Sequence, residues 1–135
     1  MEAQRNVQRL RPLRVMLSMS DRRCMRVTAF LLARRGYDVV QDGGRNPLEA
    51  ATRARSDVVV LEAQGSRAEA ARMLATLAAS NASPGVVAVV ADDLAKAFPG
   101  IPTVSKWTPI DELAREIDAV SLSRGAPAAQ RTSFS

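Results

Sequence analysis

Near the middle of the chain stands the stretch Asp57-Val58-Val59-Val60-Leu61-Glu62, an apolar run with an acidic residue at each end. A strand with one face in water would alternate apolar and polar residues, and this run does not. Strands that are apolar throughout are typical of parallel sheets with helices on both faces. The run Val86-Val87-Ala88-Val89-Val90 has the same character. The stretch therefore predicts a buried strand that delivers the Glu62 carboxylate to the edge of an α/β domain.

Strand and helix patterns alternate on both sides of this stretch. Short apolar runs predict further strands over residues 15–19, 37–40, 86–91 and 103–105. Apolar residues at helical spacing predict helices over 22–35, 47–55, 66–79 and 110–122. Alternating strands and helices build parallel sheets with helices on both faces. The sequence thus predicts a doubly wound domain with a five-stranded parallel sheet.

Helix boundaries carry their own signals. Ser20 or Asp21 can cap the first helix, because a short side-chain oxygen accepts an otherwise unbonded backbone N–H there. Gly36 ends that helix, since glycine takes the left-handed conformation without steric cost. Asn46-Pro47-Leu48-Glu49 and Ser66-Arg67-Ala68-Glu69 have the composition of helix starts.

The segment between residues 90 and 106 departs from this pattern. It contains Pro99, Gly100 and Pro102, which leave room for little more than one helical turn of about 3.6 residues. A helix between the last two strands is therefore expected to be short, distorted or absent.

Length and composition indicate one domain of 135 residues. We expect a flexible N-terminal tail over 1–12, a folded domain over 13–122, and a disordered tail over 123–135, which is small, polar and without periodicity. The single cysteine, Cys24, excludes an internal disulfide and favours a reducing cytoplasm. No apolar run approaches the roughly 20 residues of a membrane span, so no membrane association is expected.

The chain has no histidine, which excludes histidine catalysis and most zinc sites. No nucleophile–base pair is visible either, so the sequence predicts neither an enzyme nor a bound cofactor or metal. The net charge is +5, carried mostly by arginine. Because this charge is scattered along the chain, we attribute it to composition. Nucleic-acid binding through the N-terminal tail and first helix stays an alternative.

Ligands bind doubly wound sheets beyond the carboxyl ends of the strands. Glu62 ends the third strand there, and an unpaired buried carboxylate is costly. Lys106, at the end of the fifth strand, is the expected partner, although the pair could be purely structural. Trp107 beside it could anchor an interface or cover the gap left by a missing helix, and we favour the second role.

In order and spacing, these features resemble the receiver domain of two-component response regulators over residues 14–120. Residues 57–62 resemble the third strand of a receiver, with Glu62 in place of the phospho-accepting aspartate. The run Lys106-Trp107-Thr108-Pro109-Ile110-Asp111-Glu112-Leu113 resembles the lysine–proline motif before the last helix, and Gly36-Tyr37-Asp38-Val39-Val40 resembles the start of the second strand. The resemblance implies a flavodoxin-like sheet with strand order 2-1-3-4-5.

Phosphorylation chemistry does not carry over with this resemblance. A receiver holds Mg²⁺ between its aspartate and an acidic pair, whose positions here read Met19-Ser20, with Asp21 just beyond. The switch hydroxyl would fall on Val90 or Ala91, and neither has one. The longer Glu62 side chain would also misplace in-line attack on a phosphodonor.

The main hypothesis is therefore a degenerate pseudo-receiver, held in one state by a Glu62–Lys106 ion pair. It would bind a protein partner or form a homodimer in cytoplasmic bacterial signal transduction. The alternative is a small-ligand or nucleotide sensor at the same sheet edge, where the side chains of Ser18, Ser20, Gln64 and Ser66 could supply hydrogen bonds.

Overall fold

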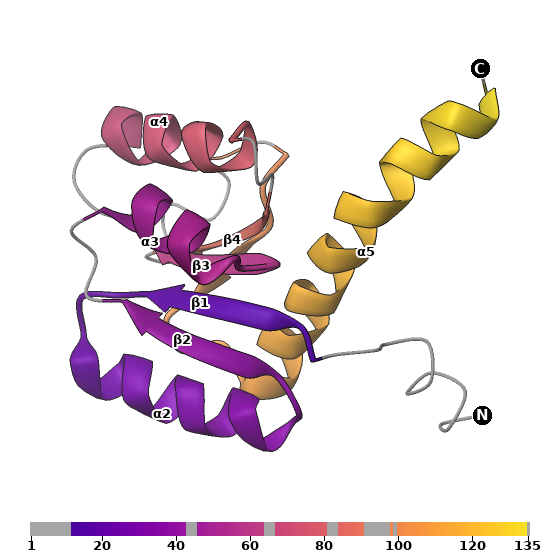
Figure 1. Cartoon of the computed structure of the whole chain (residues 1–135). Coiled ribbons are helices and arrows are strands. Elements are labelled where there is room, and N and C mark those ends of the chain that lie inside the picture. Colours follow the sequence, from indigo (N-terminus) through magenta and orange to yellow (C-terminus); the bar gives the residue numbers. More distant parts are fainter. Residues whose placement is uncertain are drawn as a thin grey trace.

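The computed structural model describes residues 12–42, 46–63, 67–80, 84–90, 98 and 100–134, and for residues 123–134 it describes the backbone alone. Figure 1 shows a sheet with helices packed on both of its faces. No helix in the described ranges is long and apolar enough to span a lipid bilayer.

The sheet has five parallel strands, β1 (Arg14–Ser18), β2 (Asp38–Asp42), β3 (Val58–Glu62), β4 (Gly85–Val90) and β5 (Thr103–Ser105). Their spatial order is β2-β1-β3-β4-β5, which confirms the predicted flavodoxin-like arrangement. β3 lies in the middle, between β1 and β4. Its first four residues are buried and Glu62 is half-buried, as expected for a strand that is apolar up to its carboxyl end.

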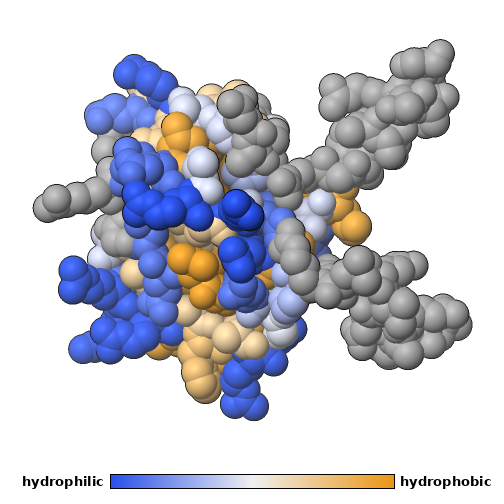
Figure 2. Space-filling view, viewed as in Figure 1, coloured by the Kyte–Doolittle hydropathy of each residue, from blue (hydrophilic) through white to orange (hydrophobic). Residues whose placement is uncertain are grey.

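Two pairs of helices cover the sheet. α2 (Arg22–Arg34) and α5 (Ile110–Phe134) pack on one face, and α3 (Pro47–Ala54) and α4 (Arg67–Ala78) pack on the other (Figure 1). Successive residues of β3 point to opposite faces, because Val58 and Val60 join one core cluster while Val59 and Leu61 join the other. The apolar run at β3 therefore follows from burial on both sides. The face in Figure 2 is mostly hydrophilic, with apolar residues showing in small areas.

The predicted helix signals are confirmed where they are described. Asp21 is the residue that caps α2, and its side chain accepts a hydrogen bond from the Cys24 backbone N–H at 3.0 Å. Gly36 follows the end of α2 with a φ of +97°, which a residue with a side chain rarely adopts. Asn46 caps α3 by accepting from the Glu49 N–H at 3.1 Å. Ser66 lies outside the described residues.

Several predicted boundaries need correction. The last helix was expected to end near Leu122, but the backbone of α5 continues as a helix to Phe134. The disordered tail expected over 123–135 stays a prediction. Once a helix has formed, each added residue gains a backbone hydrogen bond without a new nucleation cost, so a segment without apolar periodicity can still extend it. The expected short or missing fourth helix falls largely on residues 91–97 and 99, outside the described ranges, as does most of the 1–12 tail.

β1 begins one residue earlier than the apolar run suggested, at Arg14. The Arg14 backbone N–H donates to the Asp57 carboxylate at 2.8 Å, and the Asp57 N–H donates back to the Arg14 carbonyl at 2.8 Å. The Arg14 side chain reaches outward to the Asp38 carboxylate at 2.9 Å. A charged residue therefore starts a strand because only its backbone enters the sheet.

Gly85 tests how closely β4 approaches α5. A Cβ added at this position would lie 2.9 Å from the Val120 Cγ2 atom and 3.2 Å from the Val120 carbonyl oxygen. We expect Gly85→Ala to lower the free energy of unfolding by about 1–3 kcal/mol, because the overpacked helix and strand must move apart. Chemical denaturation measures this change.

The control is Val120→Ala in both backgrounds. Removing the Val120 methyl groups relieves part of the overlap, so this substitution should cost less in the Gly85→Ala protein than in the parent. Equal costs in the two backgrounds would contradict the proposed contact.

Candidate functional site

Polar side chains from three parts of the chain meet at the carboxyl edge of the sheet. Glu62 comes from the end of β3, Ser20 and Asp21 from the β1–α2 loop, and Lys106 from the β5–α5 loop. They form two separate contacts, one around Glu62 and one around Lys106.

The Glu62 carboxylate is held by Ser20. Its Oε1 atom accepts a hydrogen bond from the Ser20 backbone N–H at 2.7 Å and another from the Ser20 hydroxyl at 2.9 Å. Hydrogen bonds to a carboxylate are stronger than those between neutral groups. We expected this carboxylate to need a partner, and the loop after β1 supplies two hydrogen-bond donors to it.

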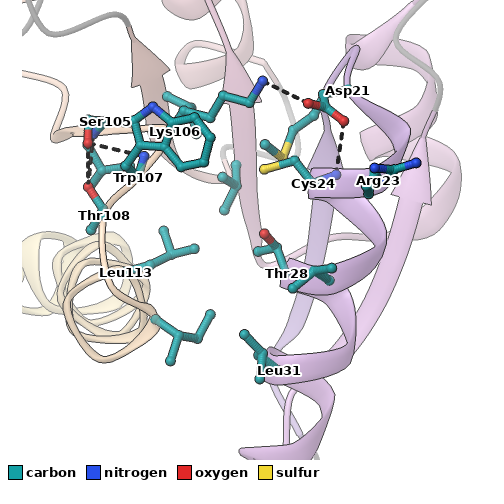
Figure 3. Close-up of a pocket in the computed structure, with 16 residues that line it drawn as sticks. Asp21, Arg23, Cys24, Thr28, Leu31, Ser105, Lys106, Trp107, Thr108 and Leu113 are labelled. Carbon is teal, nitrogen blue, oxygen red and sulfur yellow. Dashed lines mark hydrogen bonds and ion pairs between the residues drawn. The ribbon is translucent and has the colours of Figure 1, made fainter.

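Lys106 forms its ion pair with Asp21, and the predicted Glu62–Lys106 pair was wrong. The Lys106 Nζ lies 2.8 Å from Asp21 Oδ2, while Asp21 Oδ1 accepts the capping bond from Cys24 (Figure 3). Capping fixes the Asp21 carboxylate at the start of α2, within reach of the lysine, whereas the nearby Glu62 carboxylate is hydrogen-bonded to Ser20. Asp21 was predicted as a cap or as a remnant of an acidic pair, and its cap role places it beside Lys106.

These contacts shift both ionisation equilibria. The Cys24 N–H and then the Lys106 ammonium lower the pKa of Asp21 below its ordinary 3.8. The hydrogen bond to Asp21 raises the pKa of Lys106 above its ordinary 10.5, and the charge of Glu62 acts more weakly in the same direction.

The pH window of the pair follows from these directions. The contribution of Asp21 is present above about pH 3.8 and is lost as the pH falls through its lowered pKa. The contribution of Lys106 is present below about pH 10.5 and is lost as the pH rises through its raised pKa. Both side chains remain partly exposed, so the pair fixes the position of two loops more than it stabilises the fold.

Trp107 does not pack over a gap, and the packing role we favoured for it was wrong. Its side chain is 81% exposed, with the Lys106 Nζ 5.8 Å from the ring centroid. The turn around it is fixed from within, because the Ser105 N–H donates to the Thr108 hydroxyl at 2.9 Å and the Trp107 N–H donates to the Ser105 hydroxyl at 3.3 Å. A rigid turn thus presents an exposed tryptophan.

Of the other predicted site residues, some lie in the described part of the chain and some do not. Val90 is buried at the end of β4 and has no hydroxyl, whereas Ala91 and Gln64 lie outside the described residues. Ser18 is buried, and its hydroxyl donates to the Asp42 carboxylate at 3.3 Å. Neither Ser18 nor Ser20 therefore offers a hydroxyl without a partner to a ligand at this edge.

The described residues at this edge do not fit a magnesium ion. Mg²⁺ takes six oxygen ligands in a tight octahedron, usually including carboxylates. Both oxygens of Asp21 are used by Cys24 and Lys106, and the buried Met19 offers no oxygen where a receiver has an acid. In the part of the chain that the structure describes, no group of three or more acidic, cysteine or histidine residues could hold a metal ion.

Sequence reasoning missed two features of this region. One is a pocket of about 380 Å³ between α2 and α5, which borders Asp21, Lys106 and Trp107. The other is the buried Tyr37, whose hydroxyl donates to the Asp118 carboxylate at 2.7 Å and ties the start of β2 to α5. Apolar residues on two different helices form the pocket, and no sequence period signals such a meeting.

Nucleic-acid binding was predicted through the N-terminal tail and the first helix. Of these two, the structure describes the helix, α2. Arg22, Arg23, Arg26 and Arg34 are exposed on it, and α2 contains no acidic residue. The N-terminal arginines that would extend this basic surface lie outside the described residues, so nucleic-acid binding remains a prediction.

The fold is that of response-regulator receiver domains. No protein-family model and no curated protein matches the sequence. Solved structures do match, with low sequence identity and nearly complete overlap. A response regulator from Desulfuromonas acetoxidans is 20% identical, with a TM-score of 0.66 over 80% of this chain and 95% of that one.

Two further structures give the same result. The signal receiver domain of a modulated diguanylate cyclase from Desulfovibrio desulfuricans G20 is 18% identical, with a TM-score of 0.70 over 86% of this chain and 98% of that one. The signal receiver domain of a putative Luxo repressor protein from Vibrio parahaemolyticus is 16% identical, with a TM-score of 0.69 over 89% and 97%. The receiver-domain resemblance in the sequence is therefore confirmed at the level of the fold.

The Asp21–Lys106 pair can be tested by titration. We expect Lys106→Met to raise the pKa of Asp21, which should stay below 3.8 because the Cys24 N–H still donates to it. Asp21→Asn should lower the pKa of Lys106 toward 10.5. NMR chemical shifts of the two side chains measure both changes.

Arg67→Met on α4 is the matched control, since it removes a positive charge on the other face of the sheet. It should leave the pKa of Asp21 unchanged. An Asp21 pKa that does not respond to Lys106→Met would show that the ion pair does not form in solution.

Proposed function

We propose that the chain is an atypical receiver domain that acts as a phosphorylation-independent interaction module in signal transduction. Its partner would be another protein or a second copy of the chain. The observation that carries the proposal is that the charged side chains at the sheet edge already bond to one another and to their neighbours. Glu62 is hydrogen-bonded to Ser20, and Lys106 is paired with Asp21.

Among the described residues, the groups at this edge argue against phosphoryl transfer. Transfer to a carboxylate requires a metal ion and positioned cations that neutralise the developing charge. The resemblance places an acid at Met19, an aspartate at Glu62 and a hydroxyl at Val90 or Ala91. The two Ser20 hydrogen bonds also hold the Glu62 carboxylate in place through its Oε1 atom.

The same contacts favour one fixed conformation. A switch needs an element with two arrangements of similar free energy. The Asp21–Lys106 pair links the β1–α2 and β5–α5 loops, and the Glu62–Ser20 contact links β3 to the first of them. A domain with these links would present one surface constantly, as an interaction module does.

Exposed apolar side chains beside this edge and along α2 supply a contact surface. Trp107 is 81% exposed, and Val27 and Phe30 on α2 are 54% and 61% exposed. Large aromatic side chains of this kind contribute strongly at protein interfaces. These residues are the first candidates for contact with a partner.

The alternative, a small-ligand sensor, has one observation in its favour. The 380 Å³ pocket between α2 and α5 lies beside the carboxyl edge of the sheet and is within the size range of small-molecule sites. The module and the sensor are compatible, since a ligand in this pocket would touch Trp107.

Phosphodonors test the main proposal. Incubation with acetyl phosphate or beryllofluoride plus Mg²⁺ should give no stoichiometric adduct by intact-mass spectrometry and no magnesium-dependent change in the NMR spectrum. The reason is that this edge lacks both the acceptor aspartate and the acidic pair. A response regulator that accepts the same phosphodonor, treated in parallel, serves as the positive control.

The substitution Glu62→Asp separates the loss of the acceptor aspartate from the loss of the acidic pair. It restores the acceptor but not the acidic pair, so it should also stay unmodified. A stoichiometric adduct on the parent protein would overturn the proposal, and an adduct on Glu62→Asp alone would show that a functional metal site is still present.

A further inference from the structure

The pocket between α2 and α5 has apolar walls. Thr28 and Leu31 of α2 and Leu113 of α5 project into it from opposite sides (Figure 3). One valine from each of β3, β4 and β5 also lines it. Val27, on the α2 side, is 54% exposed although it is apolar. Covering such surface is favourable in proportion to the apolar area removed from water.

The mouth of the pocket carries a fixed cation. Lys106 reaches from the β5–α5 loop to Asp21 across this end of the pocket (Figure 3). An ammonium group has three donors, and Asp21 accepts from one of them. Asp21 thus holds the ammonium in position and leaves it donors for a second acceptor.

Other groups at the mouth decide the sign of a ligand. Arg23 lines the pocket and is exposed, but its side chain lies on the side of α2 away from Lys106 (Figure 3). The Ser105 and Thr108 hydroxyls lie 3.2 Å apart and hydrogen-bond to each other. Glu62 does not line the pocket, and its carboxylate is bonded to Ser20. The lining thus holds two cations, Lys106 and Arg23, and one carboxylate, Asp21, while the charge of Glu62 also acts on Lys106. This balance favours a ligand with one negative charge over a ligand with several.

A nucleotide fits this arrangement poorly. It brings several negative charges and a polar sugar, whereas the pocket offers mainly apolar walls and two cations, one already paired. A compact apolar body with one carboxylate matches both the walls and the mouth.

We propose that the pocket binds a small amphipathic carboxylate, with its apolar chain between α2 and α5 and its carboxylate at Lys106. This assignment deepens the small-ligand alternative and does not depend on the interaction module. Bound ligand would lie against Trp107, so its presence would alter the surface that a partner meets.

Octanoate is the probe, and octylammonium, with the same apolar length and the opposite charge, is the matched control. The only tryptophan, Trp107, and the only cysteine, Cys24, both line the pocket. Octanoate should change Trp107 fluorescence, slow alkylation of Cys24 and raise the melting temperature. Octylammonium should bind about tenfold more weakly or worse, since it cannot accept from Lys106.

Two substitutions on α2 locate the binding. Thr28→Phe fills the pocket and should abolish all three octanoate effects, whereas Ala33→Phe adds the same ring at an exposed position outside the lining and should preserve them. Circular dichroism without ligand checks that both proteins fold. If Thr28→Phe does not fold, two measurements on the parent protein still test the assignment. They are the slower alkylation of Cys24 with octanoate and the tighter binding of octanoate than of octylammonium.

Equal binding of octanoate and octylammonium, or octanoate binding that survives in folded Thr28→Phe, would overturn the assignment. The phosphodonor experiment tests phosphorylation of the sheet edge and not ligand binding in the pocket. A phosphoryl adduct would overturn the interaction module and leave this pocket assignment standing, and absence of octanoate binding would do the reverse.

Discussion

The structure depends on the burial of β3 from both faces. A strand with helices on both sides has no face on which to carry a charge, so its polar residues are confined to its two ends. Asp57 at one end is bonded to the Arg14 backbone, and Glu62 at the other is bonded to Ser20. The position of the candidate site therefore follows from the hydrophobic effect, because the first place after the core where a carboxylate can be solvated is the carboxyl edge.

At that edge, the exchange of residue types changes what the fold can do. Geometry that serves phosphoryl transfer needs carboxylates left available to a metal ion. Here Asp21 is committed to a helix cap and a lysine, and Glu62 is committed to a serine. At this edge the described side chains hold two loops together, and an apolar pocket and an exposed tryptophan lie beside them.

The fold was predictable from sequence because its signals are local. The valine runs of β3 and β4 report burial directly, and Asp21, Gly36 and Asn46 act within a few residues of their own positions. The partner of Lys106 was not predictable, since two carboxylates lie near it in the fold and the choice between them depends on which is already satisfied. Trp107 was misjudged for a similar reason, because its exposure is set by a turn closed by Ser105 and Thr108.

Asp57, just before β3, and Glu62, at its end, also bear on the register of the strands. In strands with one solvent-exposed face, the alternation of apolar and polar residues sets the register. A slip of one residue would expose the apolar side chains to water. β1 and β3 are buried on both faces, so a slip would exchange one apolar side chain for another, and their interiors specify the alignment weakly. Asp57 bonds the N–H of the first residue of β1, and Glu62 bonds the N–H of Ser20 beyond its last. The correct alignment of a sheet made of nearly interchangeable valines is thus marked at its two ends by carboxylates.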